Sequence, residues 1–275
     1  MRKIDFKDRW VVITGASSGL GREMALIMAK QEKAKLIIAA RRKRNLEQLK
    51  KEIETSSGTR VEAVEVDLSI SRNVEQLFEK ATEIGNIYAL INNAGLTAYG
   101  KSDKKDLNTY EKMLQVNFMA AMKLSLLFIS HFQKHGEGII LNITSQSAFV
   151  PIPYQNIYSA SKSALQSFSD GLREEYRYSG IVICSYAPGG IDTEMVSSSG
   201  IADNISPNPF FMMNPHKASI KAIRALKKGK ALEIPSFIYK LNHLLTHFLP
   251  RRWMVYVAAK IYKPKQSSAE ISGKK

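Results

Sequence analysis

A tyrosine and a lysine stand four residues apart in the segment Tyr158-Ser-Ala-Ser-Lys162. On a helix this spacing places both side chains on one face, so that the ammonium lies near the phenol. A nearby cation favours the phenolate and is expected to lower the pKa of the tyrosine from its ordinary value of about 10. The pair therefore predicts a general acid for use near neutral pH, although a solvated helix face can show the same spacing by chance.

Other polar residues fall where they could join this pair. Ser145 follows an apolar run, Asn92-Asn93-Ala94-Gly95 ends another, and Asn117 lies inside a long predicted helix. The ends of neighbouring parallel strands meet at the sheet edge where ligands bind. A short polar side chain inside a helix is unfavourable unless it is hydrogen-bonded. Each feature alone is more often structural than chemical, but together they indicate a catalytic site.

A glycine-rich turn, Thr14-Gly-Ala-Ser-Ser-Gly-Leu-Gly21, stands between the first predicted strand and the first predicted helix. Its glycines, at positions 15, 19 and 21, allow a sharp turn and a close approach of the backbone to a pyrophosphate. The helix that follows offers free N–H groups and a partial positive charge to an anion. An ordinary tight turn is the alternative, but the position between strand and helix favours a dinucleotide site.

The end of the second predicted strand indicates which dinucleotide binds. Sites for NAD usually place an acidic residue there, to bind the ribose 2′-hydroxyl. Here the strand ends Ala39-Ala40-Arg41-Arg42, with no acid. A guanidinium can pair with a 2′-phosphate through two hydrogen bonds, so the sequence predicts NADPH rather than NADH. The alternative is that both arginines simply begin a solvated basic helix.

Alternating strands and helices must position these groups. The predicted strands are Trp10–Thr14, Lys35–Ala40, Val61–Val66, Ile87–Asn92, Gly138–Ile143 and Ile181–Tyr186. The predicted helices are Gly19–Gln31, Asn45–Thr55, Asn73–Ile84, Tyr110–His131 and Gln155–Tyr178. The strands are apolar on both faces, which predicts an α/β fold with a parallel sheet covered by helices on each side. Right-handed crossovers then give a doubly wound sheet.

Taken together with Asp67 and Pro188-Gly189, these motifs resemble the short-chain dehydrogenase/reductase family over roughly residues 8–230. The resemblance implies a Rossmann-like sheet of about seven strands and hydride transfer between a nicotinamide and a carbonyl or alcohol. It also implies that Tyr158 donates a proton to the carbonyl oxygen, which Ser145 polarises. Lys162 would bind the nicotinamide ribose and perturb Tyr158, while Asn117 would hold a water that links Lys162 to solvent.

The resemblance further implies a set of cofactor-binding residues. They are Gly15, Ser17, Ser18, Gly19, Leu20, Gly21, Arg41, Asp67, Leu68, Asn93, Ala94, Gly95, Tyr158, Lys162, Pro188, Gly189, Ile191 and Thr193. Asp67 would meet the adenine, residues 93–95 would line the adenosine side, and Pro188, Gly189 and Thr193 would position the carboxamide. Many relatives that use NADPH carry a basic residue where this chain has Ser18. Arg41 would therefore carry the 2′-phosphate, helped by Arg42 and Ser17.

The substrate end of the sequence has a long connection without clear periodicity. We place a substrate lid at residues 188–215, inside a Rossmann domain that spans residues 1–230. Long loops at the ligand edge can close over a substrate. The apolar residues of the lid, Met195, Ile201, Ile205 and Phe210–Met213, favour an apolar substrate, unless the last four merely pack on the body.

Residues 231–275 form a basic, amphipathic extension. From Met212 to Lys275 there are 14 Lys and Arg residues against 2 Asp and Glu, whereas the whole chain of 275 residues carries 40 against 25. Ala231–Pro235 predicts a short strand, and two helices follow, on either side of Pro250. These helices either cover the substrate cleft, with their charges facing water, or contact an anionic membrane.

Composition excludes several other classes of protein. One cysteine, Cys184, rules out an internal disulfide, and the five histidines show no metal-ligand spacing, so we predict no metal. The basic residues have no nucleic-acid motif around them, so we expect no nucleic-acid partner. The N-terminus shows no apolar stretch long enough for a signal peptide, so we expect none, and no window offers the roughly 20 uninterrupted apolar residues of a spanning helix. We expect a cytoplasmic homodimer or homotetramer, either free or peripheral to a membrane.

The sequence therefore predicts an NADPH-dependent oxidoreductase of lipid metabolism, which reduces a lipophilic ketone or a 3-oxoacyl group. Two alternatives stay open. One is an NADP-dependent alcohol dehydrogenase for a steroid or retinol-like substrate, because the same groups serve both directions of hydride transfer. The other is a non-catalytic, membrane-associated protein that binds NADP, although such a protein would not need Tyr158.

Overall fold

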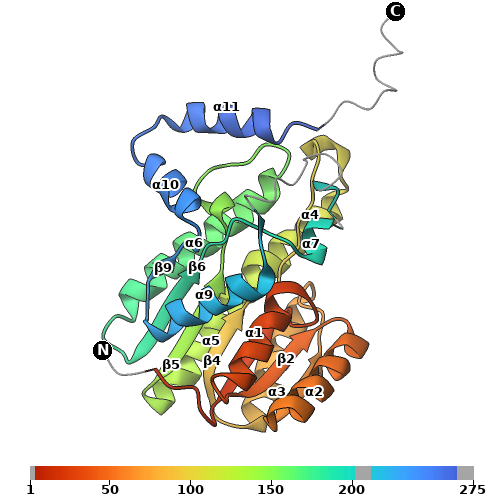
Figure 1. The fold of residues 1–275 in the computed structure, drawn as a ribbon, viewed down its shortest axis with the longest axis vertical. Coiled ribbons are helices and arrows are strands. Elements are labelled where there is room, and N and C mark those ends of the chain that lie inside the picture. Colours follow the sequence, from red (N-terminus) through yellow and green to blue (C-terminus); the bar gives the residue numbers. More distant parts are fainter. Residues whose placement is uncertain (1–3, 198, 202–211, 265–275) are drawn as a thin grey trace, which may run out of the picture.

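Seven parallel strands form one twisted sheet in the order β3-β2-β1-β4-β5-β6-β9 (Figure 1). The computed structural model describes residues 4–197, 199–201 and 212–264. The strands are β1 (Trp10–Thr14), β2 (Lys35–Ala40), β3 (Val61–Glu65), β4 (Ile87–Asn92), β5 (Gly138–Ile143), β6 (Ile181–Tyr186) and β9 (Leu232–Glu233). All residues of β1, β4 and β5 are buried, because both faces of the central strands are covered.

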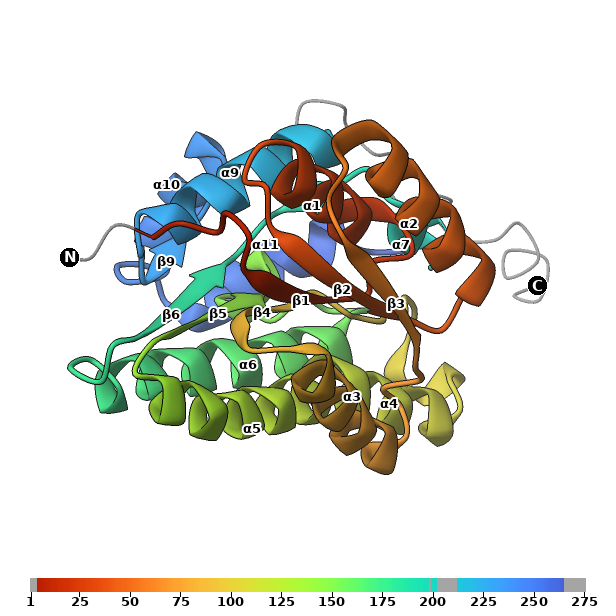
Figure 2. The same cartoon turned by 90° about the horizontal axis from the view of Figure 1, so that it is seen from below.

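Helices cover both faces of this sheet, as Figure 2 shows: α1, α2 and α9 lie on one side, and α3, α5 and α6 on the other. Their bounds are α1 (Gly19–Lys30), α2 (Lys43–Ser57), α3 (Ser71–Ile84), α4 (Leu107–Leu114), α5 (Ala120–His135), α6 (Asn156–Glu175) and α9 (Pro215–Lys227). Each side of the sheet has its own apolar core, with Met24 and Met28 in one and Phe128 and Phe132 in the other. The predicted Rossmann-like, doubly wound fold is confirmed.

The long helix that the sequence predicts around residues 110–131 is interrupted. α4 passes into a π-helical turn, Gln115–Met119, before α5 begins. The combined helix, Leu107–His135, is long and apolar enough to cross a membrane by length and composition, although Gln115, Asn117 and Lys123 interrupt its apolar residues. Within it, however, Leu124, Phe128 and Phe132 are fully buried against the sheet. Its apolar character therefore belongs in large part to the protein core.

The chain beyond residue 230 completes the sheet before it leaves the body. β9 pairs with β6 through Leu232 and Glu233, so the seventh strand lies inside the extension that we separated on composition. Two helices follow, α10 (Phe237–Leu245) and α11 (Arg251–Ile261), and both lie at one end of the molecule (Figure 1).

The described part of the lid, residues 188–197, 199–201 and 212–215, contains short elements. β7 (Gly190–Ile191) pairs with β8 (Met212–Met213), and α7 (Glu194–Ser197) lies between them. The expectations for Ile205 and for Phe210 and Phe211 fall outside the described residues.

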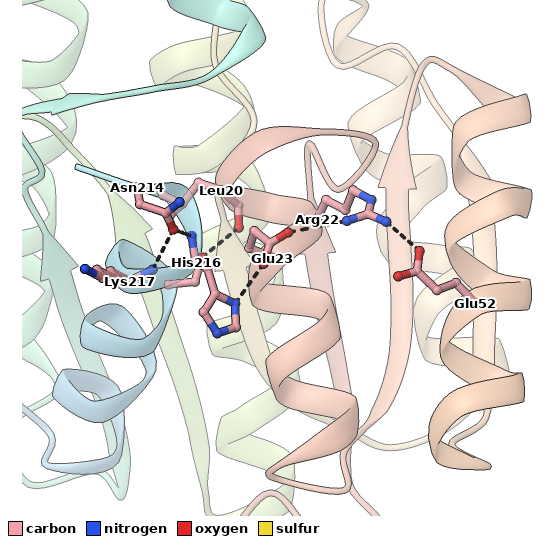
Figure 3. Close-up of polar contacts among 8 residues, drawn as sticks. Leu20, Arg22, Glu23, Glu52, Asn214, His216 and Lys217 are labelled. Atoms are coloured by element: carbon pink, nitrogen blue, oxygen red, sulfur yellow. Dashed lines mark hydrogen bonds and ion pairs between the residues drawn. The ribbon is translucent and has the colours of Figure 1, made fainter. Parts of the chain in front are cut away.

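Polar contacts anchor the helix that follows the glycine-rich turn (Figure 3). The Asn214 side chain caps α9 by accepting hydrogen bonds from the backbone N–H groups of His216 and Lys217. The His216 ring then lies 2.9 Å from a carboxylate oxygen of Glu23 on α1. Ser219 of α9 also donates to the carbonyl oxygen of Leu20, over 3.3 Å. These contacts fix the start of α1 relative to the sheet, and with it the turn that precedes α1.

Candidate active site

The glycine-rich turn between β1 and α1 has no room for side chains at two of its glycines. Gly15 and Gly19 adopt φ of +66° and +53°, which favours glycine. A Cβ at Gly15 would come within 2.8 Å of the Ala94 Cα, and one at Gly21 would overlap the Asn93 amide nitrogen. Ser18 precedes α1 without a side-chain cap, so the first N–H groups of this helix remain available to an anion. The residues thus fit a pyrophosphate.

Asn93 and Thr14 hold this turn in place. The Asn93 side chain donates to the carbonyl oxygens of Thr14, at 2.9 Å, and Gly15, at 3.2 Å. The Thr14 hydroxyl accepts from the backbone N–H groups of Asn93 and Ala94 and donates to the carbonyl oxygen of Ile91. The amide of Asn93 is therefore used to join the ends of β1 and β4, a role that the sequence did not reveal.

Of the two arginines after β2, Arg42 reaches the glycine-rich turn. Its guanidinium donates to the hydroxyls of Ser17, at 3.1 Å, and Ser18, at 2.6 Å. A third contact joins Arg42 to the carboxylate of Glu194, at 2.7 Å, which holds the pKa of Glu194 below its usual range. Arg41, which we predicted as the phosphate-binding residue, is exposed, and no contact of its side chain with the turn is seen among the described residues.

The remaining residues expected at the cofactor come from three other places. Asp67 follows β3 and accepts from the Ser69 N–H at 2.9 Å, and Leu68 beside it is buried. After β6, the Pro188 carbonyl oxygen accepts from the Gln146 N–H at 2.9 Å. Thr193 reaches the turn, since a Cβ at Gly19 would lie 3.1 Å from its methyl carbon. The carboxyl edge of the sheet therefore gathers these predicted residues.

Ser145, Tyr158 and Lys162 come together at the same edge. Ser145 follows β5, whereas Tyr158 and Lys162 lie in the first two turns of α6. The hydroxyl of Ser145, which donates to the Ser147 hydroxyl at 3.2 Å, lies near enough to the Tyr158 phenol to oppose the rise of its pKa. The Lys162 ammonium donates to the carbonyl oxygen of Ile143, at 2.8 Å, and lies 6.0 Å from the centre of the Tyr158 ring. A phenol placed in this way can pass a proton to an oxygen that also reaches the serine.

The predicted effect of Lys162 on Tyr158 is wrong for the structure as it stands. Burial raises the pKa of Tyr158 above 10, and the hydrogen bond from Ser145 opposes this only in part. Lys162 is itself buried, which lowers its pKa to about 8, so it carries only part of its charge in mildly alkaline solution. Loss of hydration therefore outweighs the attraction between the ammonium and the phenolate, which are not in contact.

Asn117 lies in the π-helical turn, and its side chain is fully buried. Its amide nitrogen donates to the Leu96 carbonyl oxygen and the Ser161 hydroxyl, both at 2.9 Å, and its oxygen accepts from the Leu96 N–H at 2.7 Å. The side chain thus ties the loop after β4 to α6, close to Lys162. Since π-helical turns shift the pairing of backbone carbonyls, we expect a water at this residue to be held by the backbone.

Tyrosines from the C-terminal helices cover the site, and sequence reasoning missed them. The Tyr239 ring fills the space that a Cβ at Gly189 would need, and its hydroxyl accepts from the Gly190 N–H at 3.3 Å. Burial, with the phenols of Tyr239 and Tyr158 nearby, raises the pKa of Tyr262 to about 12. Tyr99 in turn donates to the Tyr262 carbonyl oxygen at 2.7 Å. The two helices therefore pack against the segment after β6 and against Tyr99, with the Tyr262 phenol on the side of Tyr158, and the cover of the substrate cleft stays a prediction.

Comparisons with known proteins agree with this geometry. Residues 9–204 match the family model of the short chain dehydrogenases. The chain is 34% identical, over 70% of its length and 75% of the relative, to the NADP-dependent 3-hydroxy acid dehydrogenase of Schizosaccharomyces pombe. It is 30% identical to the very-long-chain 3-oxoacyl-CoA reductase of Homo sapiens, over 84% and 77% of the two chains.

A solved structure extends the likeness to most of the chain. It is a short-chain dehydrogenase from Sphingobium yanoikuyae in complex with NADPH, with 26% identity and a TM-score of 0.79. The alignment covers 95% of this chain and 99% of that one. A nicotinamide cofactor follows from these likenesses and from the fit of the glycine-rich turn. The chain belongs to the short-chain dehydrogenase family and is an oxidoreductase.

Proposed function

We propose that this protein is an NADPH-dependent reductase for a carbonyl group of a lipophilic substrate, a ketone or a 3-oxoacyl chain. The observation that carries the proposal is the meeting of Ser145, Tyr158 and the buried Lys162 at the carboxyl edge of the sheet, with the Lys162 ammonium 6.0 Å from the centre of the Tyr158 ring. A reduced nicotinamide, when bound, would supply the hydride for the carbonyl carbon. Tyr158 then gives its hydroxyl proton to the carbonyl oxygen, and Ser145 donates a hydrogen bond to the same oxygen as negative charge develops there.

The two directions of the reaction use opposite protonation states of Tyr158. Reduction needs the neutral phenol as a proton donor, whereas oxidation of an alcohol needs the phenolate as an acceptor. Burial raises the pKa of Tyr158, so the neutral form prevails near neutral pH. The neutral phenol is ready for reduction, while an alcohol dehydrogenase stays the alternative because the same groups would serve it at a higher pH.

The choice of NADPH rests on Arg42. The segment after β2 contains no acidic residue that would repel a 2′-phosphate. Arg42 already lies on Ser17 and Ser18, and a guanidinium with two serine hydroxyls is a donor set suited to phosphate oxygens. The names of two similar proteins, which are NADP-dependent or bound to NADPH, point the same way. We therefore assign to Arg42 the role that we expected for Arg41.

The substrate class rests on the cover over Tyr158. Tyr239 and Tyr262 present aromatic surface there, and Met195 from α7 approaches Gly95 from the lid, so that a Cβ on Gly95 would lie 3.5 Å from its terminal methyl. Aromatic and methionine side chains suit an apolar chain or ring. The likeness to a very-long-chain 3-oxoacyl-CoA reductase supports an acyl substrate and a place in lipid metabolism.

The test is transfer of deuterium from labelled NADPH to a panel of ketones and 3-oxoacyl thioesters by the purified protein. Tyr158→Phe should lower the turnover by about a hundredfold or more, because general acid catalysis is lost. Tyr154→Phe is the matched control, since that tyrosine has no cation four residues later and should keep its activity. Equal turnover by the wild type and Tyr158→Phe would refute the mechanism, and NADPH binding without any turnover would favour the non-catalytic alternative.

We also propose a homo-oligomer formed through the helices α4 to α6. Leu107, Leu114, Met119 and Leu126 of the long helix are between 39% and 73% exposed, which leaves apolar surface outside the core. Light scattering of the purified protein should give a dimer or a tetramer. A monomer at micromolar concentration would refute this part of the proposal.

A further inference from the structure

The outer side of α10 is apolar. Phe237, Leu241, Leu244 and Phe248 are spaced by four, three and four residues, so they follow one face of the helix and the turn after it. Their exposed fractions are 80%, 48%, 53% and 75%. A helix that faces water normally shows polar side chains on this side. The outer side of α10 therefore resembles a helix surface that is buried against a membrane or another protein.

α11 also exposes aromatic side chains. Trp253 and Tyr256 lie on successive turns and are 55% and 57% exposed, and Ile261 at the end of the helix is 60% exposed. Tryptophan and tyrosine favour the boundary between water and lipid, because they combine an apolar ring with a polar group. We call this set, Phe237, Leu241, Leu244, Phe248, Trp253, Tyr256 and Ile261, the outer face.

Cations surround the outer face, and acids are missing from the segment that builds it. Residues 237–264 contain Lys240, Arg251, Arg252, Lys260 and Lys263, and no Asp or Glu. Lys240 lies 3.5 Å from Glu233 of β9, and Lys260 lies over the Tyr256 ring. Arg251 and Arg252 are exposed at the start of α11, next to Trp253. Such a surface matches anionic phospholipid headgroups in charge, with apolar groups between the cations.

The inner side of the same two helices contacts the site. Tyr239, which directly precedes Lys240 and Leu241 in α10, accepts a hydrogen bond from the Gly190 N–H through its hydroxyl. Tyr262 follows the last residue of α11, and its phenol lies near that of Tyr158. Figure 1 shows α10 and α11 together at one end of the molecule, apart from the helices that cover the sheet. The two helices that carry the outer face therefore also contact the loop beside the candidate site.

We propose that the outer face docks on an anionic lipid bilayer, and that a lipophilic substrate passes from this bilayer under α10 and α11 to Tyr158. The route of the substrate rests on the proposed function, whereas the docking does not. The helices lie along the surface and do not cross it, since α10 and α11 have only 9 and 11 residues.

The docking is tested by flotation of the full chain with vesicles, which needs no catalysis. Vesicles of phosphatidylcholine alone are compared with an equal mixture of phosphatidylcholine and phosphatidylglycerol. We expect binding to the mixed vesicles, and a decrease of roughly tenfold or more for the double variant Phe237→Ser, Phe248→Ser. The double variant Arg251→Gln, Arg252→Gln should lose about fivefold for each charge removed, on the mixed vesicles only.

Matched variants separate this surface from exposed residues in general. Tyr178→Ser removes an aromatic side chain that is 93% exposed but lies after α6, away from α10 and α11. Lys51→Gln with Arg72→Gln removes two exposed charges, on α2 and α3. Both controls should float like the wild type. Equal losses in the controls, or no flotation of the wild type, would overturn the proposal.

The same variants separate docking from two other outcomes. Tyr158→Phe should float normally, so a failure of the proposed chemistry leaves the docking result intact. If the wild type does not float but is an oligomer that Phe237→Ser, Phe248→Ser dissociates, then a second copy of this chain covers the outer face, and the proposal is wrong. With docking shown, the double variant should keep its rate on a water-soluble ketone and lose rate only on a substrate dissolved in the vesicles.

Discussion

The glycine-rich turn and the cover formed by α10 and α11 differ in how they contact the rest of the protein: the turn is fixed by hydrogen bonds and tight packing, and the cover by a few ring contacts. In the turn, Thr14 and Asn93 use their polar groups to join two strands, and Gly21 leaves no room for one extra carbon. The cover meets the body through a few rings, such as Tyr239 on Gly189 and Phe149 on His243, and leaves apolar residues exposed. The difference suggests that the turn serves a fixed ligand, while the cover can vary with the substrate.

The largest effect is expected from filling the turn. Gly21→Ala puts a methyl group where the Asn93 amide lies, and overpacking of this kind costs about 1–3 kcal/mol. Binding of NADPH, measured by calorimetry, should weaken by up to about a hundredfold. Gly171→Ala is the control, because nothing lies within 4 Å of its new Cβ and the change favours a helix. If Gly21→Ala binds NADPH like Gly171→Ala, the turn is not built as tightly as we describe.

Replacing each of the two neighbouring arginines by alanine tests which of them favours NADPH over NADH. Arg42→Ala should weaken NADPH binding by about tenfold and leave NADH binding unchanged, because it removes a charged hydrogen-bond donor from Ser17 and Ser18. Arg41→Ala should change neither. Fluorescence titration with both nucleotides gives the answer. A larger effect from Arg41 would restore our sequence-based assignment.

A change in the cover should affect substrate binding and leave cofactor binding unchanged. Tyr239→Ala removes the ring that packs on Gly189 and opens the site to water. We expect KM for a long-chain substrate to rise by roughly fivefold, with an unchanged Kd for NADPH. Phe237→Ala, on the outer side of the same helix, should leave both constants unchanged for a water-soluble substrate. A rise in the Kd for NADPH would show that the two regions are not separate.

The smallest effect is a pH dependence that arises at Lys162. Its pKa is lowered to about 8 in the folded protein and lies near 10.5 when unfolded, so the unfolded chain binds more protons between these values. This residue therefore makes the protein more stable as pH rises through 8. Lys162→Met removes that slope, so its stability relative to the wild type should fall by about 1 kcal/mol between about pH 7 and about pH 9. Urea unfolding at both pH values measures this, and parallel curves would contradict the burial of Lys162.

The fold was predictable because its strands are apolar on both faces and its glycines occur where β1 meets α1. Strand bounds such as Ile87–Asn92 and Gly138–Ile143 agree with the prediction, since Asn, Gly and polar segments bracket each run. The π-helical turn at Asn117 was not predicted, because it changes the hydrogen bonding of the helix and not its apolar periodicity.

Parts of the site depend on contacts that spacing does not show. Two adjacent arginines are equivalent in sequence, and only the path of the backbone into α2 brings Arg42 to the turn. Tyr239 and Tyr262 belong to no motif and reach the site because α10 and α11 fold back over it. The error for Tyr158 has the same origin, because the degree of burial decides its pKa, and a helix face alone does not show the degree of burial.

In the protein without cofactor, the Glu194 carboxylate occupies the position at Arg42 that we propose for the 2′-phosphate of NADPH. A ribose phosphate that arrives at Arg42 competes with a carboxylate that already sits there, so only the difference between two charged contacts favours NADPH. Glu194 begins α7, and its displacement would free this short helix just as the dinucleotide settles. Exchange of one anion for another would then link binding of the coenzyme to the position of α7.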